Sequence, residues 1–455
     1  MNQSTGLKKL WHLLNETQFT LTPHHCVTAA LIFLSVLPVF VSATFPFLSV
    51  EVRATMIDAA VMYIFGNYWR DCLYLSGIFA ALGTLFFWAN HCRTNGLSFP
   101  QHKSFRDKTL SIFLFFLLAW SFLSTLASSN FHLSFWGTAY RQEGWLTYLI
   151  YAFIFSSALL LDQKHSYIVI ETLCAGCAAT GLLIIGLQKG LDVPFFLSDP
   201  ASAMFHNSNH YGYYLAICLP LCMGLLIGKT PSHPLVICLR SVEFWLICNA
   251  SAVSSVRGSF LGIISTVIIW NIIILKLHRE KATALFLADT ILLATLFAFN
   301  TGNGLFSHFF DAITDVKNVT SGDPSALDNI GSGRGELWRF GIQFIGEHPI
   351  LGYGPDNLGY RYMEINPLLL DRPHNELIQI AASLGIPALL FYLCALWSHL
   401  RAFIRSLSRL SVFELALFSG IASYLISSVF GNTMYYTTPY FYLLLGLTYQ
   451  IHKTG

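Results

Sequence analysis

Residues 109–127 read TLSIFLFFLLAWSFLSTLA and contain no charged side chain. A helix needs about 20 mostly apolar residues to cross the hydrocarbon core of a bilayer, and this stretch has that length. Water is absent from that core, so the backbone polar groups must bond to one another within the segment. The stretch therefore predicts a membrane-spanning α-helix.

The whole chain has the same apolar character. Of its 455 residues, 54% are hydrophobic and only 11% are charged, whereas soluble domains carry about 25% charged residues. So few charges cannot cover the surface of a chain of this length, and lipid must cover much of it. The composition predicts an all-α integral membrane protein with a lipid bilayer around it, arranged as one polytopic domain over residues 1–455.

Apolar runs of similar length recur along the chain, and the length criterion gives about twelve membrane-spanning helices. Pro220, Pro231 and Pro234 interrupt the region 188–257, where the bounds of the spans stay open. The approximate spans are 27–47, 72–90, 109–127, 145–161, 166–187, 211–228, 236–254, 258–275, 283–300, 375–399, 412–430 and 437–451.

Basic residues are distributed unevenly between the gaps that separate these spans. If the N-terminus is cytoplasmic, the inward gaps carry Arg93, Lys103, Arg106, Lys108, Lys164, Lys229, Arg240, Lys276, Arg279, Lys281, Arg401, Arg405 and Arg409. The short outward gaps carry only Arg53, Arg70, Arg141, Lys189 and Arg257. The positive-inside rule predicts this asymmetry when both termini are cytoplasmic.

One long gap, residues 301–373, is polar and lies outside in this topology. Connections of that length usually have a function or are disordered. The apolar residues Trp338, Phe340, Ile342 and Phe344 suggest a short amphipathic helix within it. The gap is therefore expected to be one large extracytoplasmic loop, and we interpret Asp323, Asp328 and Asp356 as turn formers.

Two arginines on this outer side are candidates for binding an anion. Arg257 lies at the outer end of a predicted span, where an arginine is costly unless it reaches the interface as an anchor or binds an anion. Arg334 lies in the Gly-Ser-rich stretch 331–335, whose small residues would let backbone amides approach a phosphate closely. A flexible loop with a solvated arginine is the alternative, and Arg339 is either a second anion contact or a surface charge.

His374 and Asn375 lie where the long outer gap becomes the next span. Histidine exchanges a proton near neutral pH, which suits a general base, but both residues could instead cap the helix. The planar guanidinium of arginine binds phosphate through two hydrogen bonds and stays charged. Two arginines and a histidine on one face could therefore hold a diphosphate and deprotonate a hydroxyl.

Several stretches resemble the O-antigen ligase and polymerase superfamily, bacterial membrane proteins with about a dozen spans and one large periplasmic loop. The resemblance covers about residues 205–400, and it is expected to mark the ligase-like core, including the loop 301–373. Its stretches are SVRGSFLG at 255–262, GRGELW at 333–338, HPILGYGPDN at 348–357, HNELIQ at 374–379 and GIP at 385–387, with YRQEG at 140–144 and FHNSNHYG at 205–212 upstream.

The resemblance implies a glycosyltransferase in the bacterial cytoplasmic (inner) membrane that needs no metal and no other cofactor. It implies that Arg257 and Arg334 bind an undecaprenyl diphosphate-linked glycan and that His374 activates the acceptor hydroxyl. Arg141, Arg339 and Asn375 are further candidates for substrate binding. The chain departs from the ligase pattern at one position, because Ala388 stands where ligases often have a second glycine after Gly385.

The sequence leaves several alternatives open. A ligase would move a finished glycan to another glycan, a lipid or a protein, whereas a polymerase would add repeat units to a lipid-linked chain. A transporter or flippase for the same lipid predicts charged groups deep within several spans, but most spans here carry none. Nothing in the sequence points to a nucleic-acid partner.

Overall fold

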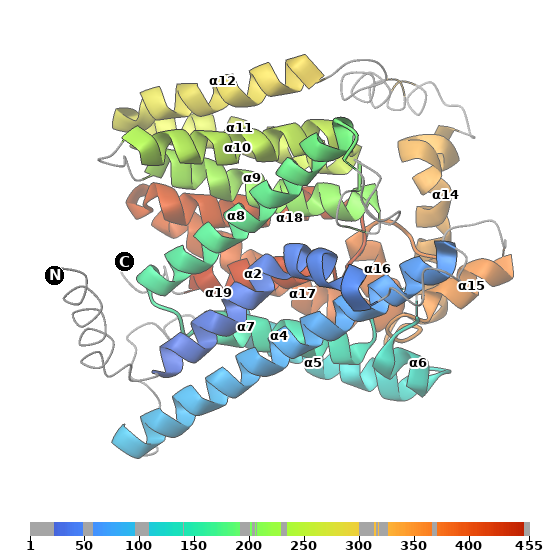
Figure 1. Ribbon diagram of the computed structural model, residues 1–455. Helices are drawn as coiled ribbons and strands as arrows, with labels where there is room; N and C mark the ends of the chain where they lie inside the picture. Colours follow the sequence, from blue (N-terminus) through green and yellow to red (C-terminus); the bar gives the residue numbers. More distant parts are fainter. Residues whose placement is uncertain are drawn as a thin grey trace.

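The computed structural model describes residues 22–48, 58–95, 109–139, 141–191, 201–202, 205, 207–228, 234–299, 314, 317, 326–365 and 371–449. All regular secondary structure within these ranges is helical, which confirms the predicted all-α class. Most of the long helices lie beside one another in one bundle, and α6, α14, α15 and α16 gather near one end of it (Figure 1).

The helices occupy most of the described chain. In order they are α2 (Pro23–Leu48), α4 (Asp58–Asn95), α5 (Thr109–Ala127), α6 (Phe131–Trp136), α7 (Trp145–Ala158), α8 (Gln163–Gln188), α9 (Ser208–Gly228), α10 (Pro234–Ser254), α11 (Arg257–Leu277), α12 (Ala282–Phe299), α14 (Ala326–Glu347), α15 (Leu358–Ile365), α16 (Glu376–Leu384), α17 (Ile386–Ser406), α18 (Val412–Ser428) and α19 (Thr438–Tyr449). Short 3-10 turns follow α11 at Arg279–Lys281 and α17 at Leu407–Arg409.

Every one of the twelve predicted spans corresponds to a helix. Nine helices in the described residues are long and apolar enough to cross a membrane. The other three, α7, α18 and α19, have 14, 17 and 12 residues, which is shorter than a full crossing requires. The chain is therefore a multi-pass membrane protein.

The helix α9 forms the centre of the bundle. Its residues are almost all buried, and it packs against α8, α10, α11 and α18. Pro220 lies inside α9 without ending it, whereas Pro234 begins α10; Pro231 lies outside the described residues. Proline is tolerated within a membrane helix because neighbouring helices and local adjustments satisfy the freed carbonyl.

The predicted span 375–399 is wrong in one respect, because it is two helices, α16 and α17, separated at Gly385. Gly385 has φ +88, and a Cβ at this position would overlap the carbonyl oxygen of Ile350. A hydrogen bond joins the same two segments, since the Ile386 N–H donates to the carbonyl of Pro349, which lies between α14 and α15, at 2.8 Å. Because of this contact α16 ends at Leu384, and the membrane-spanning helix is α17, which begins at Ile386.

The predicted loop 301–373 contains two helices, α14 and α15, at residues 326–347 and 358–365. The expected amphipathic helix exists, but it is longer than predicted and includes the stretch 331–335, which we expected to be a loop. Asp328 lies in this helix rather than in a turn, and Asp323 lies outside the described residues. The helix α14 continues through this stretch, although Gly333 within it has φ +85, because the residues that follow pack well, as Leu337 and Phe344 do.

Contacts between distant segments show which helix ends lie together. At one end, the rings of His24 and His165 stack 6.0 Å apart, and His278 bonds to the Leu410 carbonyl. At the other end, near α14–α16 in Figure 1, Arg141 pairs with Asp371. The helices thus alternate in direction, and the candidate residues share one end of the bundle.

Candidate functional site

His374 lies in the short segment 371–375 that precedes α16. The cap of α16 is Asn375, whose side-chain oxygen accepts from the Ile378 N–H at 3.1 Å. His374 has φ +50, in the left-handed region that non-glycine residues rarely adopt. Such a conformation persists only where the surroundings impose it, so Asn375 begins the helix while His374 is held in a constrained turn.

The imidazole of His374 is neutral at physiological pH. Burial lowers its pKa to about 3, and the nearby positive charges of Arg334 and Arg141 contribute to the shift. Its Nδ1 lies 3.3 Å from the side-chain nitrogen of Asn432. Its Nε2 is buried and has no hydrogen-bond partner among the described residues. A neutral imidazole can accept a proton from a ligand at whichever ring nitrogen carries no hydrogen.

Arg334 is half-buried in α14 and acts on His374 through its charge. The same guanidinium interacts electrostatically with the hydroxyl of Tyr213 in α9. The Tyr213 hydroxyl also donates to the Phe430 carbonyl at 2.7 Å. The structure therefore brings Arg334 and His374 together, with the segment between α18 and α19 next to both.

Arg257 is the first residue of α11. The residues on either side of it pack against the segment between α18 and α19. Val256 forms a small apolar cluster with Tyr213 and Met434. A Cβ at Gly258 would meet Phe430 at 3.2 Å. Arg257 is thus linked to His374 through the segment 430–434, whereas Arg334 interacts with His374 directly by charge.

Arg141 forms an ion pair beside His374. Its Nε donates to Oδ2 of Asp371 at 2.6 Å, and its Nη2 donates to the other carboxylate oxygen. Burial alone would raise the pKa of Asp371, but the hydrogen bonds and charge of Arg141 lower it overall. This pairing fixes the start of the segment that carries His374.

Arg339 lies on the exposed side of α14. It makes an ion pair with Glu336 at 3.9 Å, and its guanidinium lies 4.5 Å from the ring centre of Phe340. Exposed pairs of this kind contribute little to stability. The structure therefore favours a surface charge at Arg339.

Sequence reasoning gave Asp356 too small a role and gave Arg372 none. Asp356 does occupy a turn, with φ +59, but its carboxylate accepts from the Thr138 N–H at 2.6 Å, the Thr138 hydroxyl at 2.9 Å and Arg372. The side chains of Asp356 and Arg372 are 2% and 4% exposed. Arg372 also donates to the Thr433 carbonyl at 3.2 Å. One buried ion pair thus joins four segments around His374.

Two buried glutamates lie next to this ion pair. The Glu143 N–H donates to Asp356 at 3.2 Å, and one oxygen of the Glu143 carboxyl accepts from Tyr151 at 2.9 Å. Burial raises the pKa of Glu143 to about 8, although Arg372 opposes the shift. Burial likewise raises the pKa of Glu376 to about 6. Both residues lie in the family-like stretches, which was the only signal that could have found them.

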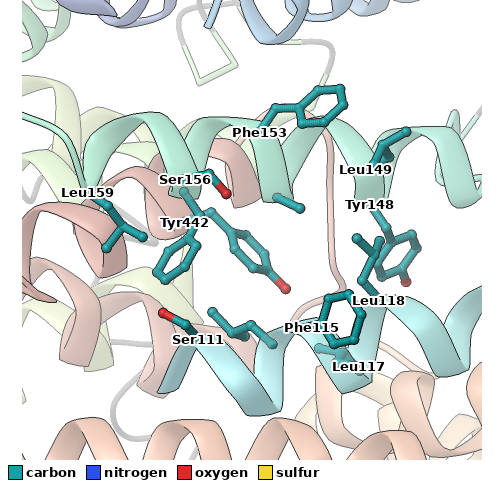
Figure 2. A pocket seen from close by; sticks show the side chains of 13 residues that line it. Ser111, Phe115, Leu117, Leu118, Tyr148, Leu149, Phe153, Ser156, Leu159 and Tyr442 are labelled. Atoms are coloured by element: carbon teal, nitrogen blue, oxygen red, sulfur yellow. The ribbon is translucent and has the colours of Figure 1, made fainter. Parts of the chain in front are cut away.

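The membrane-embedded part holds an apolar cavity of about 280 Å³ between α5, α7 and α19. Figure 2 shows the aromatic rings of Phe115, Tyr148 and Tyr442 around it. None of the candidate arginines or histidines lines this cavity. The charged chemistry therefore lies at the end of the bundle and not in this space. Within the described ranges, no group of three or more His, Cys, Asp or Glu side chains is placed to hold a metal ion.

The fold and the site define a polytopic membrane protein with a half-buried histidine and several arginines clustered at one end of its helices. The family described as O-antigen ligase matches residues 243–393, a range that includes Arg257, Arg334 and His374. This match covers about a third of the chain and supports the resemblance to the O-antigen ligase and polymerase superfamily, as well as a membrane enzyme of that ligase or polymerase type. No curated protein matches the chain.

Proposed function

We propose that this protein transfers a glycan from an undecaprenyl diphosphate donor to an acceptor hydroxyl at the outer face of the bacterial cytoplasmic membrane, with both termini in the cytoplasm. The observation that supports this most is the neutral imidazole of His374, with its Nε2 unpartnered among the described residues, beside the charge of Arg334. A base next to a cation suits the deprotonation of a hydroxyl beside a negatively charged leaving group.

The proposal assigns the diphosphate to Arg334 and Arg257. Near His374, Arg141 pairs with Asp371 and Arg372 pairs with Asp356, and these pairs hold the segment of His374 in place. Arg257 also begins α11, where the positive end of the helix dipole favours an anion. The two guanidinium groups would stabilise negative charge as it develops on the leaving diphosphate.

The reaction is a substitution at the anomeric carbon of the donor sugar. The acceptor oxygen attacks this carbon, and the bond between the carbon and the diphosphate oxygen breaks. The bonding electrons leave with the diphosphate, and the acceptor proton passes to Nε2 of His374. Attack opposite to the leaving group inverts the anomeric centre and requires no metal.

Donor binding would also raise the pKa of His374. In the free protein the pKa of His374 is about 3, partly because Arg334 and Arg141 disfavour a further positive charge. A bound diphosphate brings negative charge and offsets these cations. The pKa of His374 would therefore rise toward neutrality in the donor complex, where a base is most effective.

Reconstitution with defined substrates tests this proposal. The purified protein in lipid nanodiscs would receive an undecaprenyl diphosphate-linked glycan with a lipid A core acceptor, a protein acceptor or no second acceptor. A single addition to an acceptor indicates a ligase, whereas a ladder of repeat units on the donor lipid indicates a polymerase. Arg334→Ala is expected to reduce transfer about 10²–10³-fold, as loss of one charge-stabilising group does elsewhere.

Arg361→Gln is the matched control, because Arg361 is an arginine of the same outer region that pairs on the surface with Glu347 and Glu364. It should leave transfer unchanged. Equal activity of the Arg334→Ala and wild-type proteins would contradict the assignment of Arg334.

A flippase is the second candidate, and one observation favours it. Arg240, which was assigned to an inward gap, lies in the second turn of α10, pairs with Glu171 in α8 and donates to the Tyr167 hydroxyl at 2.7 Å, so a charged pair joins two spans near their ends. A labelled undecaprenyl diphosphate glycan in sealed proteoliposomes would distinguish the two functions. We expect no movement of the label between leaflets, and rapid movement without transfer would favour the flippase.

A further inference from the structure

Asn432 lies in the segment between α18 and α19, outside the region that matches the family. Its side chain is buried, with 3% of the residue exposed, and its amide lies 3.3 Å from Nδ1 of His374. The other atom of the amide, Oδ1, has no hydrogen-bond partner in the described part of the chain. The other end of the amide therefore has no partner that would fix which of its two atoms, oxygen or nitrogen, faces His374.

The orientation of the amide decides which nitrogen of His374 carries the proton. If the amide nitrogen faces Nδ1, then Nδ1 accepts, and Nε2 carries the hydrogen and cannot act as a base. A rotation of the amide by 180° exchanges its oxygen and nitrogen without changing its shape. In that orientation Nδ1–H donates to Oδ1, and the lone pair of Nε2 is available.

We propose that Asn432 is the positioning residue for His374: its Oδ1 accepts a hydrogen bond from Nδ1–H and thereby makes Nε2 the reactive nitrogen. The inference rests on the proposed function of His374 as the base. When Nε2 takes the acceptor proton, the imidazolium keeps its Nδ1–H bond to the same oxygen. Asn432 therefore selects the tautomer before the reaction and stabilises the cation during it.

The segment that carries Asn432 is fixed on both sides. Before it, the Phe430 carbonyl accepts from Tyr213 at 2.7 Å; after it, the Thr433 carbonyl accepts from Arg372 at 3.2 Å. The Met434 N–H then donates to the Thr438 hydroxyl at 2.8 Å. A rigid backbone suits the Asn432 amide for orienting the His374 ring, because little conformational entropy is lost when the hydrogen bond between them forms.

The charged groups around His374 come from three elements. Arg334 belongs to α14, Arg141 to the segment before α7, and Asp371 and Arg372 to the segment of His374 itself. Asp371 favours a protonated imidazole, whereas the three arginines disfavour it. A carboxylate in place of the Asn432 amide would add a second group that favours protonation, so that the pH dependence of the reaction reports on this position.

Two variants test the inference in the reconstituted transfer assay, with kcat and KM measured across pH. Asn432→Leu removes the acceptor and should lower kcat about 10–100-fold, with the KM for the donor changed less than about threefold. Asn432→Asp keeps an acceptor at Nδ1. It should retain kcat within about fivefold at high pH and move the acidic limb of the profile up by about one pH unit.

Wild-type kcat in Asn432→Leu, or an unshifted pH profile in Asn432→Asp, would overturn the inference. If Asn432→Leu does not fold, as a thermal melt would show, the profile of Asn432→Asp decides alone. His374→Ala separates this inference from the proposed function. Transfer that persists without His374 contradicts both, whereas loss of transfer in His374→Ala with full activity in Asn432→Leu contradicts only the role of Asn432.

Discussion

The buried ion pair between Asp356 and Arg372 gives a quantitative prediction. Both side chains are nearly inaccessible, and Arg372 has one other acceptor, the Thr433 carbonyl. Asp356→Asn keeps the shape and one oxygen for the donors of Thr138, but it removes the carboxylate that pairs directly with the buried guanidinium. Removal of one partner from a buried pair costs about 3–5 kcal/mol, and we expect this loss in the free energy of unfolding.

Unfolding in mixed micelles of a mild detergent and dodecyl sulfate, followed by tryptophan fluorescence at pH 7, would measure this loss. Glu364→Gln is the control, since it breaks the exposed pair with Arg361 and should cost less than about 1 kcal/mol. The double variant Asp356→Asn/Arg372→Gln removes both charges and should cost less than the sum of the single variants. A cost for Asp356→Asn no larger than that of the control, or strict additivity in the double variant, would refute the reasoning.

Two further predictions concern pH and packing. Folding holds the pKa of Glu143 at about 8, above its ordinary 4.5, so the stability it contributes is full below pH 4.5 and is lost as pH rises through 8. The melting temperature of the wild type should therefore fall relative to that of Glu143→Gln between pH 5 and pH 8.5, and a constant difference would contradict this. Gly385→Ala should prevent folding or lower the melting temperature sharply, because its methyl group would overlap the Ile350 carbonyl at φ +88. Gly346→Ala in α14 meets no atom within 4 Å and should be neutral or stabilising by about 1 kcal/mol; similar losses in the two variants would show that the contact at Gly385 is unimportant.

The spans could be predicted because a membrane helix is a local property of the sequence. A long apolar run such as 109–127 needs no distant partner to be helical in lipid. The break at Gly385 could not be predicted in this way, since it depends on a contact with Ile350, 35 residues earlier in the chain. The helical state of 331–335 was missed for a similar reason, because packing of the surrounding helix outweighed its glycine-rich composition.

The candidate site was only partly visible in the sequence. Arg257 attracted notice because an arginine beside an apolar span is costly and needs a reason. Arg334 did so because small residues surround it, and His374 because it lies where the outer gap becomes the next span. The partners that hold them in place were not visible. Asp356 meets Arg372 across 16 positions and Asn432 meets His374 across 58, and a linear pattern does not encode such pairings.

The central claim is that His374 accepts the proton of the attacking hydroxyl. Single-turnover transfer by the His374→Gln protein, with saturating undecaprenyl diphosphate-linked glycan and the acceptor identified by reconstitution, tests it most directly. The account predicts a rate lower by about 10²–10⁴-fold while the Kd for the donor changes less than about threefold. A transfer rate equal to that of the wild type, in a protein that binds the donor normally, would contradict it.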